Sequence, residues 1–253
     1  MSEPVRKSLS VLRYLSDHTG TSLTQASVAE HCHIPPATLS RMLSTFQEEG
    51  LVLRPSHRLI VPAFTLEEHG NLPPEHYRAL MSMLAELTNV TRQSAEIVVI
   101  RGAELRWQEK IEHPDLSIAI KARRGFRRGV AELDCLSRVA GAVMGWDWLE
   151  ASAGNCTFYS AGPERSGISS DAARDIIAAT DLDDVHFDAG GNEQGVRRFV
   201  RVLRVPGGAT LLVSIAEPAL LRANFDDHAK ANIDALNTHV GALEAQLLAS
   251  EHT

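Results

Sequence analysis

The sequence has few cysteines and no long apolar run. Its three cysteines, Cys32, Cys135 and Cys156, lie far apart and form no CxxC pair, which excludes a disulfide framework and fits a reducing cytoplasm. No run of about 18 or more apolar residues is present, so a membrane-spanning helix is not expected. The first twenty residues also lack the apolar stretch of a secretory signal, and we expect a cytoplasmic protein.

An excess of positive charge is also lacking. The 253-residue chain has 25 Lys and Arg against 32 Asp and Glu, a formal net charge of −7. Residues 1–65 hold six basic and five acidic side chains, whereas residues 66–253 hold nineteen and twenty-seven. Nucleic-acid binding by the first part therefore remains possible, but a large duplex-binding surface on the second part is not expected.

The polar stretch "EEHGNLPPEH", which contains Gly and Pro, divides the chain. Before it, residues 1–66 are expected to form three helices and a hairpin, with Thr24 capping the second helix and Pro55–His57 at the hairpin tip. A linker follows at 67–76. Residues 77–253 are then expected to form an α+β domain, in which helices pack around an antiparallel sheet.

Hydrophobic periodicity predicts the elements of the second domain. The expected helices are 77–91, a single apolar helix at 135–149, an amphipathic helix at 169–180 and a long helix at 225–250. The expected strands are 95–102, 104–111, 116–122, and a hairpin of 196–205 with 209–216.

The stretch 35–49, "PPATLSRMLSTFQEE", has the most informative pattern. At helical spacing one side is apolar, and the other has small polar residues around Arg41. Short side chains let a helix lie deep in the DNA major groove, where Arg reaches guanine or phosphate. A short helix before it and a hairpin after it complete a winged helix-turn-helix, although a merely solvated face is the alternative. The expected DNA contacts are Pro36, Ala37, Thr38, Ser40, Arg41, Ser44 and Thr45, with Arg54 and Arg58 beside the wing tip.

Neither a metal site nor a catalytic site is expected. The triplet "HCH" at 31–33 cannot converge on one ion, because consecutive helical residues point about 100° apart. His33 falls at the turn between two helices, where a positive φ is often required and histidine is tolerated. His113, His186, Cys135 and Cys156 have no spacing typical of a nucleophile or metal site, so no cofactor is expected.

The stretch 28–52, "VAEHCHIPPATLSRMLSTFQEEGLV", resembles the IclR (isocitrate lyase regulator) family of bacterial transcription factors, with Arg41 and Leu43 on the family's Arg and second Leu. The resemblance continues through 83–125 and 209–218. It implies a regulator and not an enzyme, with a winged helix-turn-helix followed by a GAF-like effector-binding domain. It also implies a homodimer or dimer of dimers, a palindromic double-stranded operator, and a small, often acidic, metabolite as effector.

The same resemblance would place Gly125, Ala140, Gly141, Arg198 and Ser214 in the effector pocket. The sequence departs from the family there. A proline usual in the segment 125–146 is missing, and Arg198 stands where a small or thiol residue is common. Gly190–Gly191 replaces an acidic residue of the family, so the resemblance carries over to the fold better than to the chemistry of the pocket.

The environment of Arg198 leaves two alternatives open. Strand alternation puts Arg198 on one face with Val200 and Val202, whereas Arg197 and Phe199 point to the other face. An arginine on an apolar face needs an anionic partner, because a buried unpaired charge is costly. The partner is either an internal Asp or Glu, or a carboxylate or phosphate ligand held bidentately. A second domain that binds nothing and serves only oligomerisation also remains open, as does an enzyme tethered to a winged helix.

Overall fold

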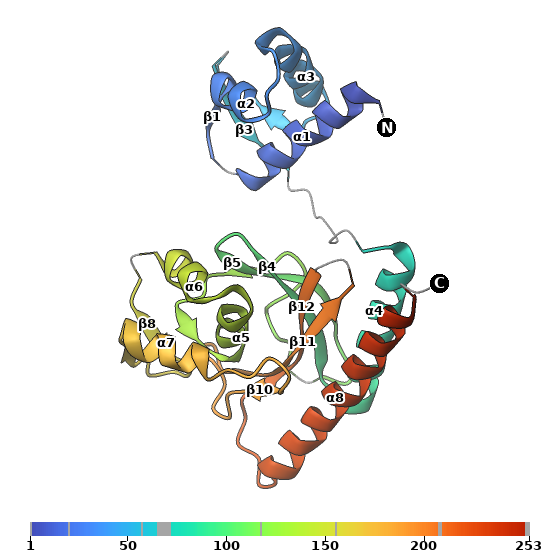
Figure 1. Cartoon of the computed structure of the whole chain (residues 1–253), viewed down its shortest axis with the longest axis vertical. Helices are drawn as coiled ribbons and strands as arrows, with labels where there is room; N and C mark the ends of the chain where they lie inside the picture. The colour runs from blue at the N-terminus through green and yellow to red at the C-terminus, as the bar shows by residue number, and fades with distance from the viewer. Residues whose placement is uncertain are drawn as a thin grey trace. The chain divides into compact units, whose positions relative to one another are not determined.

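The computed structural model describes residues 2–19, 21–56, 58–64, 72–116, 118–154, 156–206 and 209–250. The chain divides into two compact units, Met1–Glu68 and His69–Thr253 (Figure 1). Part of the predicted linker, 67–71, lies outside the described residues, and a helix begins at Pro74, within the predicted linker.

The described residues of the first unit form three helices and a small sheet (Figure 1). The helices are α1 (Glu3–Asp17), α2 (Gln25–His31) and α3 (Pro36–Glu48). The strands are β1 (Leu23–Thr24), β2 (Val52–Leu53) and β3 (Leu59–Pro62), paired antiparallel in the order β1-β3-β2. The predicted helices and hairpin are confirmed, whereas β1 is too short for periodicity to reveal.

Local sequence sets the boundaries of these helices. The Thr24 hydroxyl accepts a hydrogen bond from the Ser27 N–H at 3.1 Å, which confirms the predicted cap of α2. His33 has a φ of 52° at the turn between α2 and α3, where a positive φ is expected. Leu39 and Leu43 of α3 are fully buried against α1 and α2, so the predicted apolar side of α3 faces the core.

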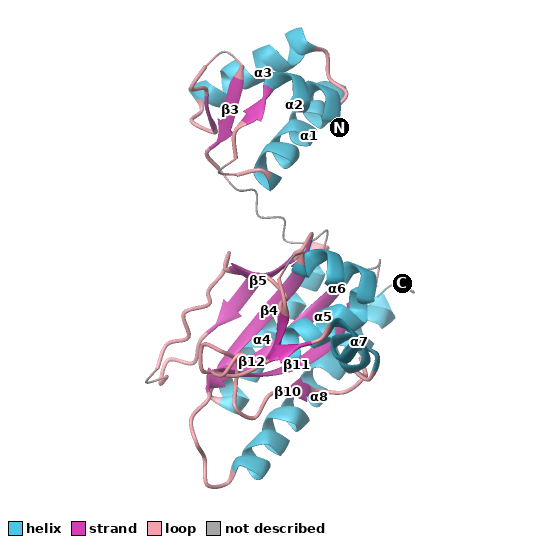
Figure 2. Cartoon of the chain, turned by 90° about the vertical axis from the view of Figure 1, so that its left-hand side faces the viewer, coloured by secondary structure: helices cyan, strands magenta, loops and turns pink. Residues whose placement is uncertain are grey.

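The second unit is built on a six-stranded antiparallel sheet with helices on both faces (Figures 1 and 2). Its order is β10-β11-β12-β4-β5-β6. The strands are β4 (Ser94–Arg101), β5 (Glu104–Ile111), β6 (Arg127–Arg128), β10 (His186–Phe187), β11 (Val196–Val205) and β12 (Ala209–Pro218). The predicted antiparallel α+β architecture is therefore confirmed.

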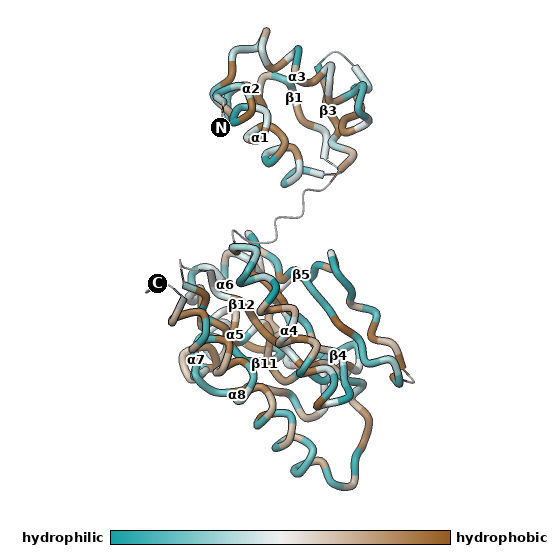
Figure 3. The backbone as a smooth tube through the Cα atoms, turned by 90° about the vertical axis from the view of Figure 1, so that its right-hand side faces the viewer, coloured by the Kyte–Doolittle hydropathy of each residue, from teal (hydrophilic) through white to brown (hydrophobic). Residues whose placement is uncertain are grey.

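Two hydrophobic cores lie on the two faces of this sheet. Figure 3 shows the apolar residues, in brown, along the central strands and the helices that cover them. One face packs against α4 (Pro74–Thr91) and α8 (Phe225–Ser250). The other face packs against α5 (Cys135–Met144), α6 (Trp146–Ala153), α7 (Ser170–Ala178) and a small sheet of β7 (Glu132–Leu133), β8 (Phe158–Ser160) and β9 (Gly167–Ile168).

The predicted strand at 116–122 is wrong. Ile120 and Ala122 are buried, but their carbonyls accept hydrogen bonds from the Lys110 ammonium at 2.8 and 2.7 Å. The Lys110 side chain thus binds carbonyls that a neighbouring strand would otherwise bind. The strand that pairs with the edge of β5 is the short strand β6. Such a contact leaves no mark on the alternation of apolar and polar residues.

The predicted single helix at 135–149 is also wrong, because Gly145 divides it. Gly145 has a φ of 89° and ends α5, and α6 starts at the next residue. The hairpin of β11 and β12 and the long helix α8 are confirmed, and the Ser169 side chain caps α7. In the part of the chain that the structure describes, no helix has both the length and the apolar composition needed to cross a membrane.

Candidate DNA-reading surface and ligand cavity

Helix α3 presents the predicted small and polar residues on its outward side. Arg41, Ser44 and Thr45 are exposed, whereas Leu39 and Leu43 on the opposite side are fully buried. The Ser44 and Thr45 hydroxyls donate hydrogen bonds to carbonyls one turn earlier, at 3.1 and 3.4 Å. These two short side chains therefore lie against the helix backbone. The longer, exposed side chain of Arg41 extends beyond them. Of the other predicted contacts, Pro36 and Ala37 are exposed, and Thr38 and Ser40 are half-buried.

The two wing arginines differ in their surroundings. Arg58 is exposed, whereas Arg54 is half-buried and its Nη2 donates to the Gln25 Oε1 at 3.2 Å. Both flank the turn between β2 and β3, whose residue His57 lies outside the described residues. The structure thus brings α3, the wing and the beginning of α2 together, and sequence reasoning missed the role of Gln25.

The described residues contain no group of three or more His, Cys, Asp and Glu side chains that could hold a metal ion. In the triplet at 31–33, His31 stacks on Tyr14 with ring centroids 4.0 Å apart, and Cys32 packs at the edge of the core. Cys135 is buried, and burial raises the pKa of its thiol well above the usual range. A buried thiol with a raised pKa is a poor nucleophile.

A cavity of about 410 Å³ opens beside the first residues of β11. It is lined by 118–122, Phe126, 194–196, Arg198 and Pro218. The charged residues in this wall are Lys121, which is exposed, and Arg198, which is 4% exposed. Binding cavities for small molecules commonly have this size, with a few polar groups in a mostly apolar wall.

The guanidinium of Arg198 has an internal carboxylate partner. Its Nε donates to the Glu96 Oε2 at 2.8 Å, and the Ser214 hydroxyl donates to the same oxygen at 3.1 Å. Its guanidinium also lies 5.0 Å from the ring centroid of Trp107. Glu96 is fully buried. Of the two alternatives that the sequence left open, the structure therefore shows the internal acid.

The other predicted pocket residues lie in different places. Ser214 does not line the cavity; its hydroxyl binds Glu96, the partner of Arg198. Gly125 directly precedes Phe126, which lines the cavity. Ala140 and Gly141 do not line the cavity; a Cβ at Gly141 would lie 2.9 Å from the Ile177 Cδ1, so this glycine allows α5 and α7 to pack closely. Glu96 was missed, although a lone carboxylate within the apolar strand "AEIVVIRG" signals a buried ion pair.

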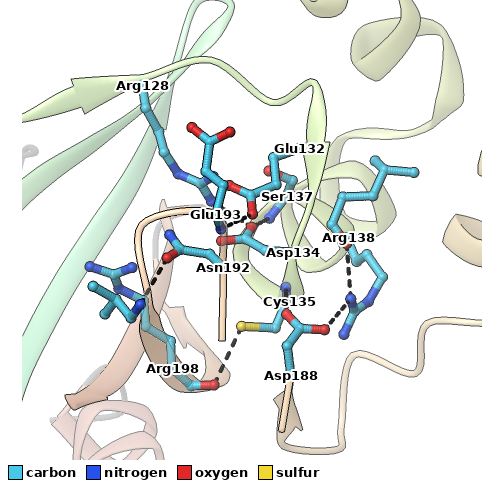
Figure 4. A network of polar contacts seen from close by, with 12 residues as sticks. Arg128, Glu132, Asp134, Cys135, Ser137, Arg138, Asp188, Asn192, Glu193 and Arg198 are labelled. Carbon is cyan, nitrogen blue, oxygen red and sulfur yellow. Dashed lines mark hydrogen bonds and ion pairs between the residues drawn. The ribbon is translucent and has the colours of Figure 1, made fainter. Parts of the chain in front are cut away.

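A second polar network lies beside the cavity wall (Figure 4). Arg128 forms ion pairs with Glu132, at 3.2 Å, and with Asp134. The other oxygen of Glu132 accepts a hydrogen bond from the Glu193 N–H at 2.7 Å. Glu193 directly precedes Gln194 of the cavity wall, so the network fixes the segment that closes one side of the cavity.

Two carboxyl groups of this network have opposite pKa shifts. Burial raises the pKa of Glu132 to about 7, and the nearby charge of Asp134 adds to the effect. Burial alone would also raise the pKa of Asp134, but Arg128 and the Ser137 N–H hold that pKa below its usual value. Asp134 therefore remains ionised and caps α5, whereas Glu132 titrates near neutral pH.

A family model described as the IclR helix-turn-helix domain matches residues 4–56. A comparison with curated proteins finds no significant match. Among solved structures, the chain is similar to an IclR homologue from Microbacterium hydrocarbonoxydans, complexed with 4-hydroxybenzoate. The identity is 16% and the TM-score 0.62, and the alignment covers 96% of this chain and 99% of the other.

Two further structures extend this similarity. IclR of Thermotoga maritima has 16% identity and a TM-score of 0.57, with 96% of this chain and 98% of the other covered. The C-terminal domain of the E. coli transcriptional regulator KdgR has 16% identity and a TM-score of 0.53, with 68% of this chain and 98% of that domain covered. At these identities the structural likeness establishes the fold.

The raised pKa of Glu132 predicts how stability depends on pH. The folded state holds a proton between pH 4.5 and about 7 that the unfolded state has lost, so the free energy of unfolding falls as pH rises through this window. Since one pKa unit corresponds to about 1.4 kcal/mol, the loss is at most on the order of 3 kcal/mol. In Glu132→Gln this loss should disappear.

Urea unfolding at a series of pH values measures this difference between wild type and Glu132→Gln. Glu164→Gln, at an exposed position, is the control and should follow the wild type. A Glu132→Gln variant whose free energy of unfolding parallels that of the wild type from pH 4.5 to 8 would show that Glu132 ionises normally.

Proposed function

We propose that the chain is a transcriptional regulator of the IclR type, in which α3 reads a palindromic operator and a small anionic metabolite in the second unit modulates this binding. The match of residues 4–56 to the IclR helix-turn-helix domain supports a DNA-binding role for the first unit. The DNA-reading role is supported mainly by the outward side of α3, where short, mostly polar side chains surround Arg41. This helix lies within the matched residues 4–56. No catalytic role is proposed.

The DNA contacts follow from the chemistry of this surface. A side of α3 with hydroxyls bound to its own backbone lets the helix axis approach the floor of the major groove. Arg41 can then reach guanine O6 and N7, and Arg54 and Arg58 can contact phosphates on either side of the wing. The seven outward residues of α3 and these two arginines form the proposed DNA surface.

We propose that the chain binds its operator as a homodimer or a dimer of dimers. One winged helix with six basic and five acidic residues makes too few phosphate contacts for tight binding. Two copies on half-sites about 34 Å apart, or a multiple of this distance, double these contacts. Val5 and Leu9 of α1 are 49% and 38% exposed, which supports α1, together with α4, as a contact between copies.

The DNA-reading role predicts that Arg41→Ala weakens operator binding while the protein stays folded. Loss of a base contact costs ~1–3 kcal/mol per half-site, which is about fivefold to 150-fold in affinity, and a symmetric dimer loses it twice. The measurement is a mobility shift on a duplex selected from genomic fragments by the wild-type chain, with two or four chains expected per duplex. Gln47→Ala, at an exposed site in the last turn of α3, should bind like wild type. Equal binding by Arg41→Ala would exclude α3 as the reader.

The proposed effector site is the cavity beside Arg198. Glu96 neutralises Arg198 and holds its Nε edge, and Trp107 lies beside its guanidinium, so this arginine is oriented before any ligand arrives. Lys121 adds a positive charge to the same wall. The excess charge of the wall is therefore positive, which favours a carboxylate. The complex of the Microbacterium homologue with an aromatic acid, 4-hydroxybenzoate, supports this chemical class.

A second candidate is a ligand-free domain that serves only in oligomerisation. The ion pair of Arg198 with Glu96, with 2.8 Å between the Arg198 Nε and the Glu96 Oε2, favours it, because that arginine does not require a ligand for its charge. Binding experiments separate the two candidates.

The effector proposal predicts that the full chain binds one or more small carboxylates and that Lys121→Met weakens this binding about tenfold, since one charged hydrogen bond is lost. Calorimetry with a panel of mono- and dicarboxylates, 4-hydroxybenzoate included, is the measurement. Lys230→Met, at an exposed position of α8, is the control. Binding of an acid equally by Lys121→Met would place the effector elsewhere, and the absence of any binding would support the ligand-free domain.

A further inference from the structure

We infer that Gln25 is a positioning residue for DNA reading: its side chain holds the wing arginine Arg54 against the first turn of α3. The inference rests on the proposed function, in which α3 and the wing contact one operator half-site together. It adds a residue of α2, which belongs neither to the outward side of α3 nor to the wing.

Gln25 contacts three segments at once. It is the first residue of α2 and is half-buried. Its backbone N–H donates to the Arg58 carbonyl at 3.1 Å, on the far side of the wing turn. Its side-chain Oε1 accepts from the Arg54 Nη2 at 3.2 Å, and its Nε2 donates to the carbonyl of Pro36, the first residue of α3, at 3.4 Å. One residue therefore joins both sides of the wing to the beginning of α3.

The chemistry of the two partners requires an amide. A guanidinium only donates hydrogen bonds, and a backbone carbonyl only accepts them. The glutamine amide has one acceptor and one donor end, so it satisfies both partners simultaneously. A glutamate at position 25 would accept from Arg54 but could not donate to Pro36, and a methionine of similar length would do neither.

The fold of the first unit does not depend on this side chain. The Thr24 hydroxyl caps α2, and the pairs Leu23–Ile60 and Thr24–Leu59 join β1 to β3 through the backbone. The hydrogen bond from the Gln25 N–H to Arg58 is also kept in any non-proline variant. Loss of the amide should therefore leave the domain folded and remove the hydrogen bonds that link the Arg54 side chain to the first turn of α3.

A double-mutant cycle tests whether Gln25 acts through Arg54. The full-length chain, Gln25→Met, Arg54→Met and the double variant are titrated with a duplex selected from a random-sequence pool by the wild type, at several salt concentrations. Each single variant should bind about fivefold more weakly and reduce the magnitude of the salt slope by about 1 per half-site, because one phosphate contact is lost. The double variant should bind no more weakly than Arg54→Met.

Controls separate positioning from damage to the fold. Gln47→Met makes the same exchange at an exposed site of α3 and should leave affinity and salt slope unchanged. The melting temperature should be the same for Gln25→Met and wild type. If Gln25→Met does not fold, Gln25→Ala takes its place in the cycle.

Three results would contradict the inference or its premise. If Gln25→Met weakens binding as much in the Arg54→Met background as in wild type, Gln25 does not act through Arg54. Unchanged affinity and slope in Gln25→Met would also overturn the inference. If the wild type itself selects no duplex from the pool, the proposed DNA-reading function fails instead.

Discussion

The buried ion pair between Arg198 and Glu96 is the interaction on which the second unit depends. Glu96 is fully buried and Arg198 is 4% exposed, so neither charge is solvated by water. Their contacts join four neighbouring strands, because Arg198 lies on β11, Ser214 on β12, Glu96 on β4 and Trp107 on β5. Burying such a pair is costly unless further hydrogen bonds support it, and the Ser214 hydroxyl supplies one to the same Glu96 oxygen.

The neighbouring arginine gives β11 a second anchor on its other face. Arg197 donates to the Glu217 carboxylate at 2.7 Å and to the carbonyls of Ala189 and Leu220, and Glu217 also contacts His228 of α8. Consecutive strand residues point to opposite faces, so the two arginines fix β11 between the cavity on one side and α8 on the other. The first residues of β11, which line the cavity, are therefore held in place by contacts on both faces of the sheet.

The sequence predicts the parts of this structure that depend on local pattern. Periodicity predicts α3 with its inward leucines, the turn residue His33 follows from its position, and alternation places Arg198 and Arg197 on opposite faces. Contacts between residues far apart in the sequence cannot be predicted from local pattern. Glu96 lies 102 residues from Arg198, and the order of the strands in the sheet brings the two together. The contact of Lys110 with 120–122 likewise replaces a strand partner without any periodic signal.

A double-mutant cycle on the buried pair tests the account most directly. The free energy of unfolding is measured by urea denaturation for wild type, Glu96→Leu, Arg198→Met and the double variant. Each single variant leaves one buried charge unpaired and should lose ~3–5 kcal/mol, whereas the double variant should lose less than either single variant. Additive losses in the double variant would contradict the pairing of Arg198 with Glu96 as the interaction that holds the centre of the sheet.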